Sequence, residues 1–529
     1  MPQLSFESRF QTFDDSSNPA RARPRVAALR EALTRLGLDG WVVPRADEHQ
    51  NEYVPPSAER LAWLTGFSGS AGAAVVLVDK AALFVDGRYT IQAREQVDGR
   101  LFQFCDLVSE PPSRWLARNA PKGGKIGYDS WLHTPAQVEA LRKGAEQAGA
   151  ALVALDANPV DAIWTDRPAA PCAPIALHPD RLAGETAAAK LRRIAQALGG
   201  ADGLVVSDPH AVAWTFNIRG GDVAHTPLPL SWAILPREGR ARLYVEGAKL
   251  SNSVRAALED LADVREPAAM IADLEQLARE KKRLLFDSAT APEKLATHYR
   301  ESGGAADVAV DPIALMKAQK NAVELRGARA AHIRDGAAMV EFLAWFAATA
   351  PKGRLSEVSA AQALETFRRA TGKLKEISFP TISAFGAHAA LPHYRVTTPR
   401  DTKIGKGIYL VDSGGQYLDG TTDITRTTIV GRPMREMRDK YTRVLKGHIA
   451  IATSVFPPGT TGAHLDAFAR RALWEAGCDF DHGVGHGVGA YLSVHEGPQR
   501  ISKLANTPLL PGMILSNEPG YYREGAYGI

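Results

Sequence analysis

The chain has 529 residues, and at about 150 residues per domain this length predicts three or four domains. Hydrophobic residues make up 45% and charged residues 23%, which excludes a disordered, collagen-like or coiled-coil protein for most of the chain. Lys and Arg total 63 against 59 Asp and Glu, with no run of five basic residues, so we expect no nucleic-acid partner. No apolar stretch approaches the roughly 18 residues of a transmembrane helix, so we expect no membrane partner.

The cysteines and the first residues point to a reducing compartment. Cys105, Cys172 and Cys478 are far apart and form no CxxC pair, which favours reduced thiols. Residues 1–20 contain no apolar core of a secretory signal. We therefore expect a cytoplasmic protein.

The N-terminal third alternates between helical and β-rich patterns. Residues 24–38 carry apolar residues at helical spacing, and short β-rich runs follow at 41–43, 73–78 and 81–86. Such alternation predicts an α/β domain. The proline-rich passage at 167–174 cannot continue a helix and marks a linker.

Two short motifs of this region recur further along the chain. DGWVV at 39–43 returns as DGLVV at 202–206, and LFVDG at 83–87 returns as LYVEG at 243–247. The offsets of 163 and 160 residues nearly agree, although chance explains either match alone. The pair predicts a duplication that gives two related α/β domains.

The remaining region has a different pattern. Long helical patterns at 321–349 and 355–370 precede strand-rich sequence, and further helical patterns follow at 436–455 and 462–476. Helices that flank strands with hairpin-like spacing predict an α+β domain rather than a parallel sheet. We expect three domains, over residues 1–166, 167–318 and 319–529.

Two aspartates flank a predicted hairpin in the third domain. Asp412 ends an apolar strand, and Asp423 follows eleven residues later. A turn at Asp419–Gly420 places Asp423 opposite Gln416, so both aspartates share one face, about 13 Å apart along the strands. A bulge at 414–415 would close that gap. On spacing alone, a solvated pair beside a turn explains them equally well.

Histidines gather in the same region: seven of the fourteen lie between residues 388 and 495. Two of them belong to HGVGHGVG at 482–489, whose glycines allow close backbone approach, and Glu518 stands before a Pro-Gly turn. A glycine-rich turn with incidental histidines, and an ordinary turn at Glu518, remain the alternatives. Taken together, Asp, Asp, His and Glu form a donor set suited to a pair of Mn²⁺, Co²⁺ or Zn²⁺ ions.

The sequence around four of these residues resembles that of the pita-bread metallopeptidases. LVDSGG, GTTDITRT, GVGHGVG and NEPGYY surround Asp412, Asp423, His486 and Glu518. Within this group the chain is most similar to the aminopeptidase P family, in its three-domain, cytosolic form. DGWVVPRADEHQNEY, FSGSAG and VDGRYTIQA extend the resemblance to the N-terminal region. It implies two creatinase-like α/β domains followed by a pita-bread catalytic domain.

The resemblance also implies a site with two divalent metal ions, most often Mn²⁺, with Co²⁺ or Zn²⁺ as alternatives. Asp412 should chelate one ion and Asp423 should bridge both, while His486 and Glu518 should bind the other. The family uses a fifth ligand, a second bridging glutamate, just after the segment that ends at Ile529. We therefore expect this ligand beyond Ile529, and expect the 529-residue chain to bind its second metal poorly and to be nearly inactive.

Three histidines match further positions of the family. By resemblance, His393 should contact the substrate, His495 should contact the scissile carbonyl or the proline side, and His482 should be another substrate-binding residue. A metal-bridging hydroxide would attack the Xaa carbonyl, and Glu518 would transfer its proton to the proline nitrogen. His393, His495 and Glu518 are thus the expected catalytic residues.

The expected activity is removal of the N-terminal residue from peptides with proline in the second position. One alternative is another enzyme of this fold, a prolidase that cuts only Xaa-Pro dipeptides or a methionine aminopeptidase. The other is a non-catalytic pita-bread module that binds peptide or histone. We expect the two N-terminal domains to restrict access to the site and to support a homodimer.

Overall fold

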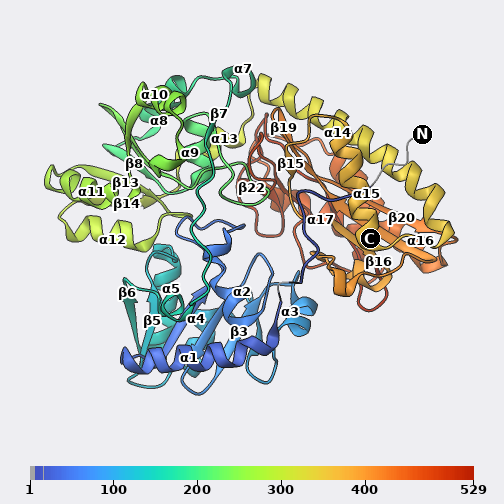
Figure 1. The fold of residues 1–529 in the computed structure, drawn as a ribbon, viewed down its shortest axis with the longest axis horizontal. Coiled ribbons are helices and arrows are strands. Elements are labelled where there is room, and N and C mark those ends of the chain that lie inside the picture. Colours follow the sequence, from blue (N-terminus) through green and yellow to red (C-terminus); the bar gives the residue numbers. More distant parts are fainter. Residues whose placement is uncertain (1–5, 16) are drawn as a thin grey trace.

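The computed structural model describes residues 6–15 and 17–529, which form three domains that meet at the centre of the molecule (Figure 1). The first domain is drawn from blue to teal, the second mainly in green, and the third from yellow to red. The predicted combination of α/β and α+β domains is confirmed, and each N-terminal domain contains a mixed rather than a fully parallel sheet.

The first domain is a six-stranded sheet of order β4-β3-β2-β1-β5-β6. Alternate residues of β1 pack on opposite faces, because Trp41 and Val43 join one apolar cluster and Val42 joins another. Both faces are thus covered by helices. The strands are β1 (Gly40–Pro44), β2 (Ala73–Leu77), β3 (Ala81–Val85), β4 (Gln103–Asp106), β5 (Lys125–Asp129) and β6 (Ala151–Leu155). The helices are α1 (Ala22–Arg35), α2 (Arg60–Thr65), α3 (Thr90–Gln96), α4 (Pro112–Asn119), α5 (Pro135–Gln147) and α6 (Pro159–Ile163).

The second domain repeats this topology with the order β12-β11-β10-β8-β13-β14. In both sheets the first strand pairs antiparallel with the second and parallel with the fifth, as the duplicated motifs predict. The strands are β8 (Gly203–Val206), β10 (Trp232–Pro236), β11 (Ala241–Tyr244), β12 (Ala262–Arg265), β13 (Arg283–Asp287) and β14 (Ala305–Ala309), with a separate pair β7 (Ala176–Leu177) and β9 (Ile218–Arg219). The helices are α7 (Asp180–Ala183), α8 (Ala187–Ala197), α9 (Pro209–Thr215), α10 (Asn252–Glu259), α11 (Met270–Arg279), α12 (Glu293–Glu301) and α13 (Pro312–Ala318).

The third domain packs helices against small antiparallel sheets. An Asn321 cap and a reciprocal Glu324 contact start its longest helix. The helices are α14 (Ala322–Thr349), α15 (Glu357–Ala370), α16 (Arg435–Ala452) and α17 (Gly462–Trp474). The strands are β15 (Glu376–Ile377), β16 (Ile382–Phe385), β17 (Gly407–Ser413), β18 (Gly415–Tyr417), β19 (Gly420–Thr421), β20 (Ile424–Val430), β21 (Gly485–Gly487), β22 (Glu496–Ile501), β23 (Tyr522–Arg523) and β24 (Tyr527–Gly528).

The hairpin that carries the two aspartates differs from the predicted one by two residues. Tyr417 pairs with Gly420, so the turn is at Leu418 and Asp419 instead of at Asp419–Gly420. The same register continues along β17 and β20, where Asp412 pairs with Thr425. Asp423 therefore precedes β20 and lies diagonally across from Asp412 on the same face. No bulge is needed to bring the two carboxylates near each other.

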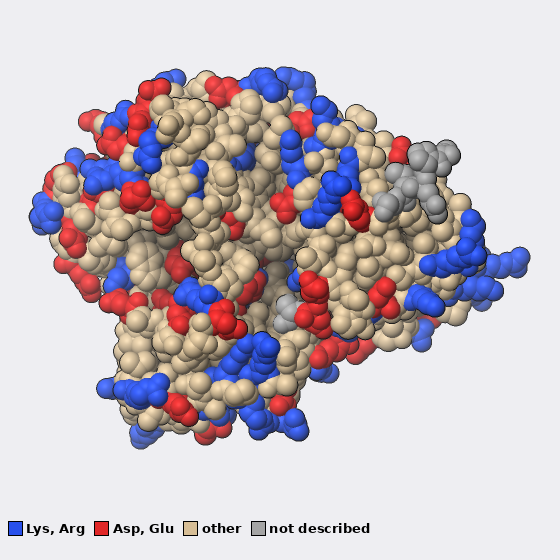
Figure 2. Space-filling model, viewed as in Figure 1, with Lys and Arg blue, Asp and Glu red and all other residues tan. Residues whose placement is uncertain are grey.

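The surface carries no field of one sign on the face that is shown. Figure 2 shows basic and acidic side chains intermingled over all three domains. Within residues 6–15 and 17–529, no helix combines the length and the apolarity that crossing a bilayer requires.

Candidate metal centre

Three of the four predicted ligands meet in one cluster. Asp423, His486 and Glu518 each offer a ligand atom, and these atoms lie within 4.8 Å of one another. His486 Nε2 lies 3.2 Å from Asp423 Oδ2 and 3.1 Å from Glu518 Oε1. His486 Nδ1 donates to the Gly487 carbonyl at 2.9 Å, which leaves Nε2 facing the two carboxylates as the candidate ligand atom. Burial alone would lower the pKa of His486, but the charges and hydrogen bonds of Glu518 and Asp423 raise it well above its usual value, so the ring is protonated until a cation displaces the Nε2 proton.

The glycines around His486 permit this arrangement through backbone contacts. A Cβ on Gly485 would collide with the Ser516 carbonyl, and one on Gly487 would collide with the Glu496 carbonyl. The segments that precede Glu518 and follow His495 therefore approach β21 more closely than any side chain would allow. The alternating glycines allow neighbouring segments of the third domain to approach each other, whereas the sequence predicts approach to a bound group.

Asp412 lies on the adjacent strand β17 and is outside the cluster of three. Its Oδ1 atom is buried and has no hydrogen-bond partner among the described residues. Burial, together with the charges of Asp423 and Glu518, raises the pKa of Asp412 well above its usual value. An orphaned carboxylate oxygen beside two other carboxylates is costly without a cation, so the four residues fit a divalent metal site.

The pKa values of Asp412 and Glu518 are shifted in opposite directions. Burial alone would raise the pKa of Glu518, but the charge and hydrogen bond of His486 lower it to about 2. Glu518 is therefore ionised while Asp412 resists ionisation in the metal-free protein. A cation bound between them would favour the charged form of both groups.

Two predicted active-site histidines are hydrogen-bonded to side chains of the first domain. His393 Nδ1 lies 2.8 Å from the Tyr89 hydroxyl, and His495 Nδ1 lies 2.8 Å from Glu52 Oε2. The His495 ring packs edge-on against His486 with centroids 4.4 Å apart, which places it beside the metal cluster. Burial and the charge of nearby Arg88 lower the pKa of His393 to about 3, so its ring is neutral.

The third histidine, His482, uses both of its ring nitrogens within its own domain. Nδ1 lies 2.7 Å from the Gly483 carbonyl, and Nε2 lies 2.8 Å from the Tyr522 hydroxyl. Burial lowers the pKa of His482 as well. Its ring is held rigidly, but the hydrogen bond to Tyr522 occupies the nitrogen that a substrate would need.

Sequence reasoning missed the contribution of the first domain. Glu52 and Tyr89 belong to the motifs DEHQNEY and VDGRYT, which carry a family likeness but no spacing that relates them to the histidines. Burial would raise the pKa of Glu52, but His495 and then Arg88 lower it below the usual range, so the group is a carboxylate. The only available signal was the presence of polar residues just after the short apolar strands β1 and β3.

The second domain holds the loop that leads to His495. Arg219 is buried and donates from Nε to the Tyr491 carbonyl at 2.6 Å and from Nη2 to the Ala490 carbonyl at 3.1 Å. Tyr491 itself has a positive φ of 54°, a conformation that non-glycine residues rarely adopt. Gln416 fixes the next residue by donating to the Leu492 carbonyl at 2.7 Å.

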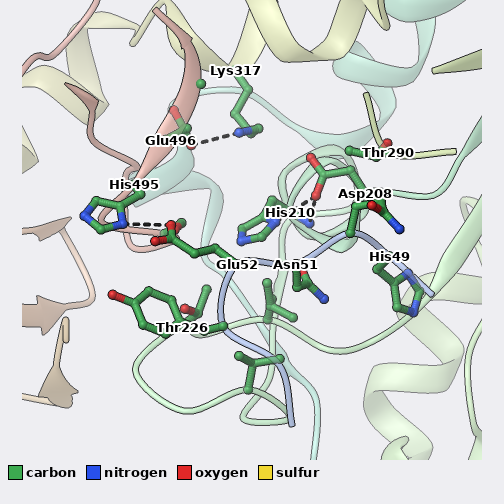
Figure 3. Close-up of a pocket in the computed structure, with 16 residues that line it drawn as sticks. His49, Asn51, Glu52, Asp208, His210, Thr226, Thr290, Lys317, His495 and Glu496 are labelled. Carbon is green, nitrogen blue, oxygen red and sulfur yellow. Dashed lines mark hydrogen bonds and ion pairs between the residues drawn. The ribbon is translucent and has the colours of Figure 1, made fainter. Parts of the chain in front are cut away.

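A cavity of about 240 Å³ adjoins this centre where the three domains meet. Glu52 and His495 border it from one side, and Asp208 and His210 of the second domain border it from the other (Figure 3). Lys317 and Glu496 form an ion pair of 3.0 Å at its edge. The cavity is lined by all three domains, and His495 lies between it and the metal cluster.

Comparison with known proteins agrees with this architecture. Residues 326–529 match Metallopeptidase family M24, and residues 25–163 and 166–324 each match the Creatinase/Prolidase N-terminal domain. The chain is 39% identical to a probable Xaa-Pro aminopeptidase P of Coccidioides posadasii, covering 99% of this chain and 83% of the relative. It is 40% identical to one of Pyricularia oryzae, covering 96% and 85%.

The chain belongs to the Xaa-Pro aminopeptidase P family of metallopeptidases. A solved structure of X-prolyl aminopeptidase from Caenorhabditis elegans, described as a cytosolic enzyme with a di-nuclear active site, has a TM-score of 0.91 and 32% identity. The matched region covers 96% of this chain and 86% of the Caenorhabditis elegans chain. Xaa-Pro dipeptidase from Bacillus anthracis, at 24% identity and a TM-score of 0.53, covers 65% of this chain and shares the fold. The expected metallo-exopeptidase class is confirmed and is favoured over prolidase.

Proposed function

We propose that this Xaa-Pro aminopeptidase P family member releases the N-terminal residue from peptides whose second residue is proline. The observation that carries the proposal is the cluster of Asp423, His486 and Glu518, with the orphaned Asp412 carboxylate beside it. The bond to be cut is a tertiary amide without an N–H group. Recognition therefore depends on contacts to its carbonyl and to neighbouring groups.

Asp423, His486 and Glu518, with Asp412 beside them, would supply four of the ligands of two divalent metal ions, which when bound provide a Lewis acid and an activated water. Glu518 would take the proton of the attacking water and deliver it to the proline nitrogen as the bond breaks. His393 and His495 would contact the peptide on either side of the scissile carbonyl. Their Nδ1 atoms are already engaged by Tyr89 and Glu52, so only their Nε2 atoms are available for these contacts.

Manganese is the metal that we propose for the site. Three carboxylates and one imidazole form an oxygen-rich donor set, which suits Mn²⁺ better than thiolate-binding ions. Zn²⁺ and Co²⁺ accept the same donors and are the competitors. Titration of the metal-free protein with each ion, followed by calorimetry and activity, distinguishes them.

We propose that the enzyme is a homodimer in which α16 and α17 of the third domain, instead of the two N-terminal domains, face a second copy. Large apolar side chains are unusually exposed along these two helices, and clusters of this kind mark protein interfaces. They are Met434, Tyr441, Leu445, Ile449, Phe468 and Trp474, each at least 43% exposed. Sedimentation velocity of the product of the complete reading frame tests this assembly.

A cytoplasmic location is proposed from chemistry and from likeness. The three cysteines are free, and one of them, Cys172, is exposed, which fits a reducing compartment. The Caenorhabditis elegans relative is described as cytosolic. Fractionation of cells that express the tagged chain tests the location.

Hydrolysis of Arg-Pro-Pro by the product of the complete reading frame, with added Mn²⁺, tests the activity. We expect free arginine to be released, and Asp423→Asn to abolish the release while Asp260→Asn, at an exposed helix end, leaves it unchanged. Cleavage of Arg-Pro but not of Arg-Pro-Pro would indicate a prolidase. Absence of both cleavage and bound metal would indicate a peptide-binding module.

A further inference from the structure

A continuous chain of hydrogen bonds joins the two reactive histidines through three side chains of the first domain. His495 Nδ1 contacts Glu52 Oε2 at 2.8 Å, and Ser70 Oγ contacts Glu52 Oε1 at 3.0 Å. Ser70 Oγ lies 2.8 Å from the Tyr89 hydroxyl, which lies 2.8 Å from His393 Nδ1. The linking residues come from loops that flank β1, β2 and α3.

The carboxylate at one end fixes the direction of the hydrogen bonds next to it. Glu52 is ionised and can only accept, so His495 donates from Nδ1 and Ser70 donates its hydroxyl proton to Oε1. If Ser70 instead gave its only proton to Tyr89, two oxygen lone pairs would face each other 3.0 Å apart at Glu52. The first arrangement leaves the Ser70 oxygen as an acceptor.

The proton of Tyr89 is then assigned as well. Its hydroxyl must donate to Ser70 Oγ, because Ser70 has no proton left to give. The Tyr89 oxygen also accepts from the Ser70 backbone N–H at 3.2 Å. Its remaining lone pair faces His393 Nδ1, which can be satisfied only if that nitrogen carries a proton.

We propose that Ser70 and Tyr89 are positioning residues that hold His393 as the tautomer protonated at Nδ1. The Nε2 atom of His393 is then a hydrogen-bond acceptor, as is that of His495 in its neutral form. Any hydrogen bond between His393 Nε2 and the bound peptide must therefore be donated by the peptide. Outer residues of this kind typically change activity by about 10- to 100-fold when they are removed.

Neutron crystallography of the deuterium-exchanged, metal-loaded enzyme tests the proton positions directly. We expect a deuteron on His393 Nδ1, none on its Nε2, and the Ser70 deuteron directed at Glu52. A deuteron of Tyr89 directed at His393, with Nε2 of His393 deuterated, would overturn the inference. This measurement is independent of whether Arg-Pro-Pro is the correct substrate.

Kinetics of matched variants tests the consequence, which rests on the proposed function. Ser70→Ala frees Tyr89 to donate to His393, so we expect kcat/KM to fall about 10-fold with unchanged metal content. Ser70→Thr retains the hydroxyl and should keep kcat/KM within about twofold of the wild type. Tyr89→Phe should lose at least as much as Ser70→Ala, and Tyr128→Phe, a buried tyrosine of the same domain near Glu293, should lose nothing.

The outcomes separate a tautomer effect from damage to the fold. Equal losses in Ser70→Ala and Ser70→Thr, or no loss in Tyr89→Phe, would overturn the proposed role of these residues. An inactive wild type that still binds metal would contradict the proposed function while leaving the neutron result to decide the inference. Thermal melts of all four variants are compared with the wild type as a control of folding.

Discussion

Glu52 and His495 lie 443 residues apart in the sequence and are joined by a hydrogen bond of 2.8 Å. The contact crosses from the first domain to the third and ends beside the metal cluster, because His495 also packs against His486. The first and third domains therefore assemble the site, and the second domain holds the loop that leads to His495.

Removal of one clustered ligand should release metal before it unfolds the chain. His486→Gln keeps a polar side chain but loses the nitrogen that lies about equally far from Asp423 and Glu518. We expect the bound metal, measured by mass spectrometry after gel filtration, to fall and kcat/KM to drop about 100-fold or more. His332→Gln, on the partly exposed face of α14, is the matched control and should keep both values. Full metal content in His486→Gln would contradict the assignment.

Arg219→Lys should weaken catalysis from the second domain without removing metal. Lys cannot reproduce the paired contacts of a guanidinium to the Ala490 and Tyr491 carbonyls. The loop before His495 would relax, and we expect kcat/KM to fall about 10-fold. Arg240→Lys, which alters a surface contact to Asp263, should have no effect. A full loss of metal in Arg219→Lys would show that the loop supports the ligands instead of His495.

Asp311 should make stability depend on pH near neutrality. Burial, with the charges of Asp287 and Asp208 nearby, raises the pKa of Asp311 from 3.8 to about 7. Its contribution to stability is full below pH 3.8 and is lost as the pH rises through about 7, because the folded state then ionises a buried carboxyl.

Asp311→Asn removes this charge and keeps the cap on the Ile313 N–H, since Asn caps helices as well as Asp. Between pH 5 and pH 8 we expect the wild type to lose on the order of 2 kcal/mol relative to the variant, seen as a lower Tm in calorimetry. Parallel melting profiles of the two proteins across this range would refute the assignment.

Trp474→Glu should separate the proposed dimer. The Trp474 side chain is 46% exposed on the apolar face of α16 and α17, and a buried charge at an interface is costly. We expect a monomer in sedimentation velocity at micromolar concentration. Ile333→Glu changes a side chain that is 75% exposed on α14 and should stay dimeric. A wild type that sediments as a monomer would exclude the dimer itself.

Local patterns were sufficient for the domains but not for the register of the hairpin. The repeats at 39–43 and 202–206 coincide with the equivalent strands β1 and β8. These strands could be predicted because a short apolar run favours a strand through its own residues. The turn at Leu418 and Asp419 depends on distant residues instead. Arg334 of α14 binds both Asp419 oxygens at 3.0 and 2.8 Å, which outweighs the local preference for an Asp-Gly turn.

The grouping of three candidate metal ligands was likewise predictable, whereas the residues that contact His393 and His495 were not. Asp423, His486 and Glu518 stand in motifs that carry their own signal, and the structure brings them together. Glu52 and Tyr89 reach the site across 443 and 304 residues of sequence, so no spacing rule applies to them. Contacts of this kind follow only from how the domains dock.

The candidate ligands and the residues that orient the two histidines belong to different domains, and this affects how a purified sample should be assessed. The ligand cluster is built within the third domain, while the partners of His393 and His495 arrive with the first. A preparation with the first domain displaced would still bind metal, yet its two histidines would be free to rotate and to change tautomer. The metal stoichiometry of a sample therefore gives the fraction of filled sites. The fraction of catalytically active sites requires a measurement of whether the first domain is docked on the third.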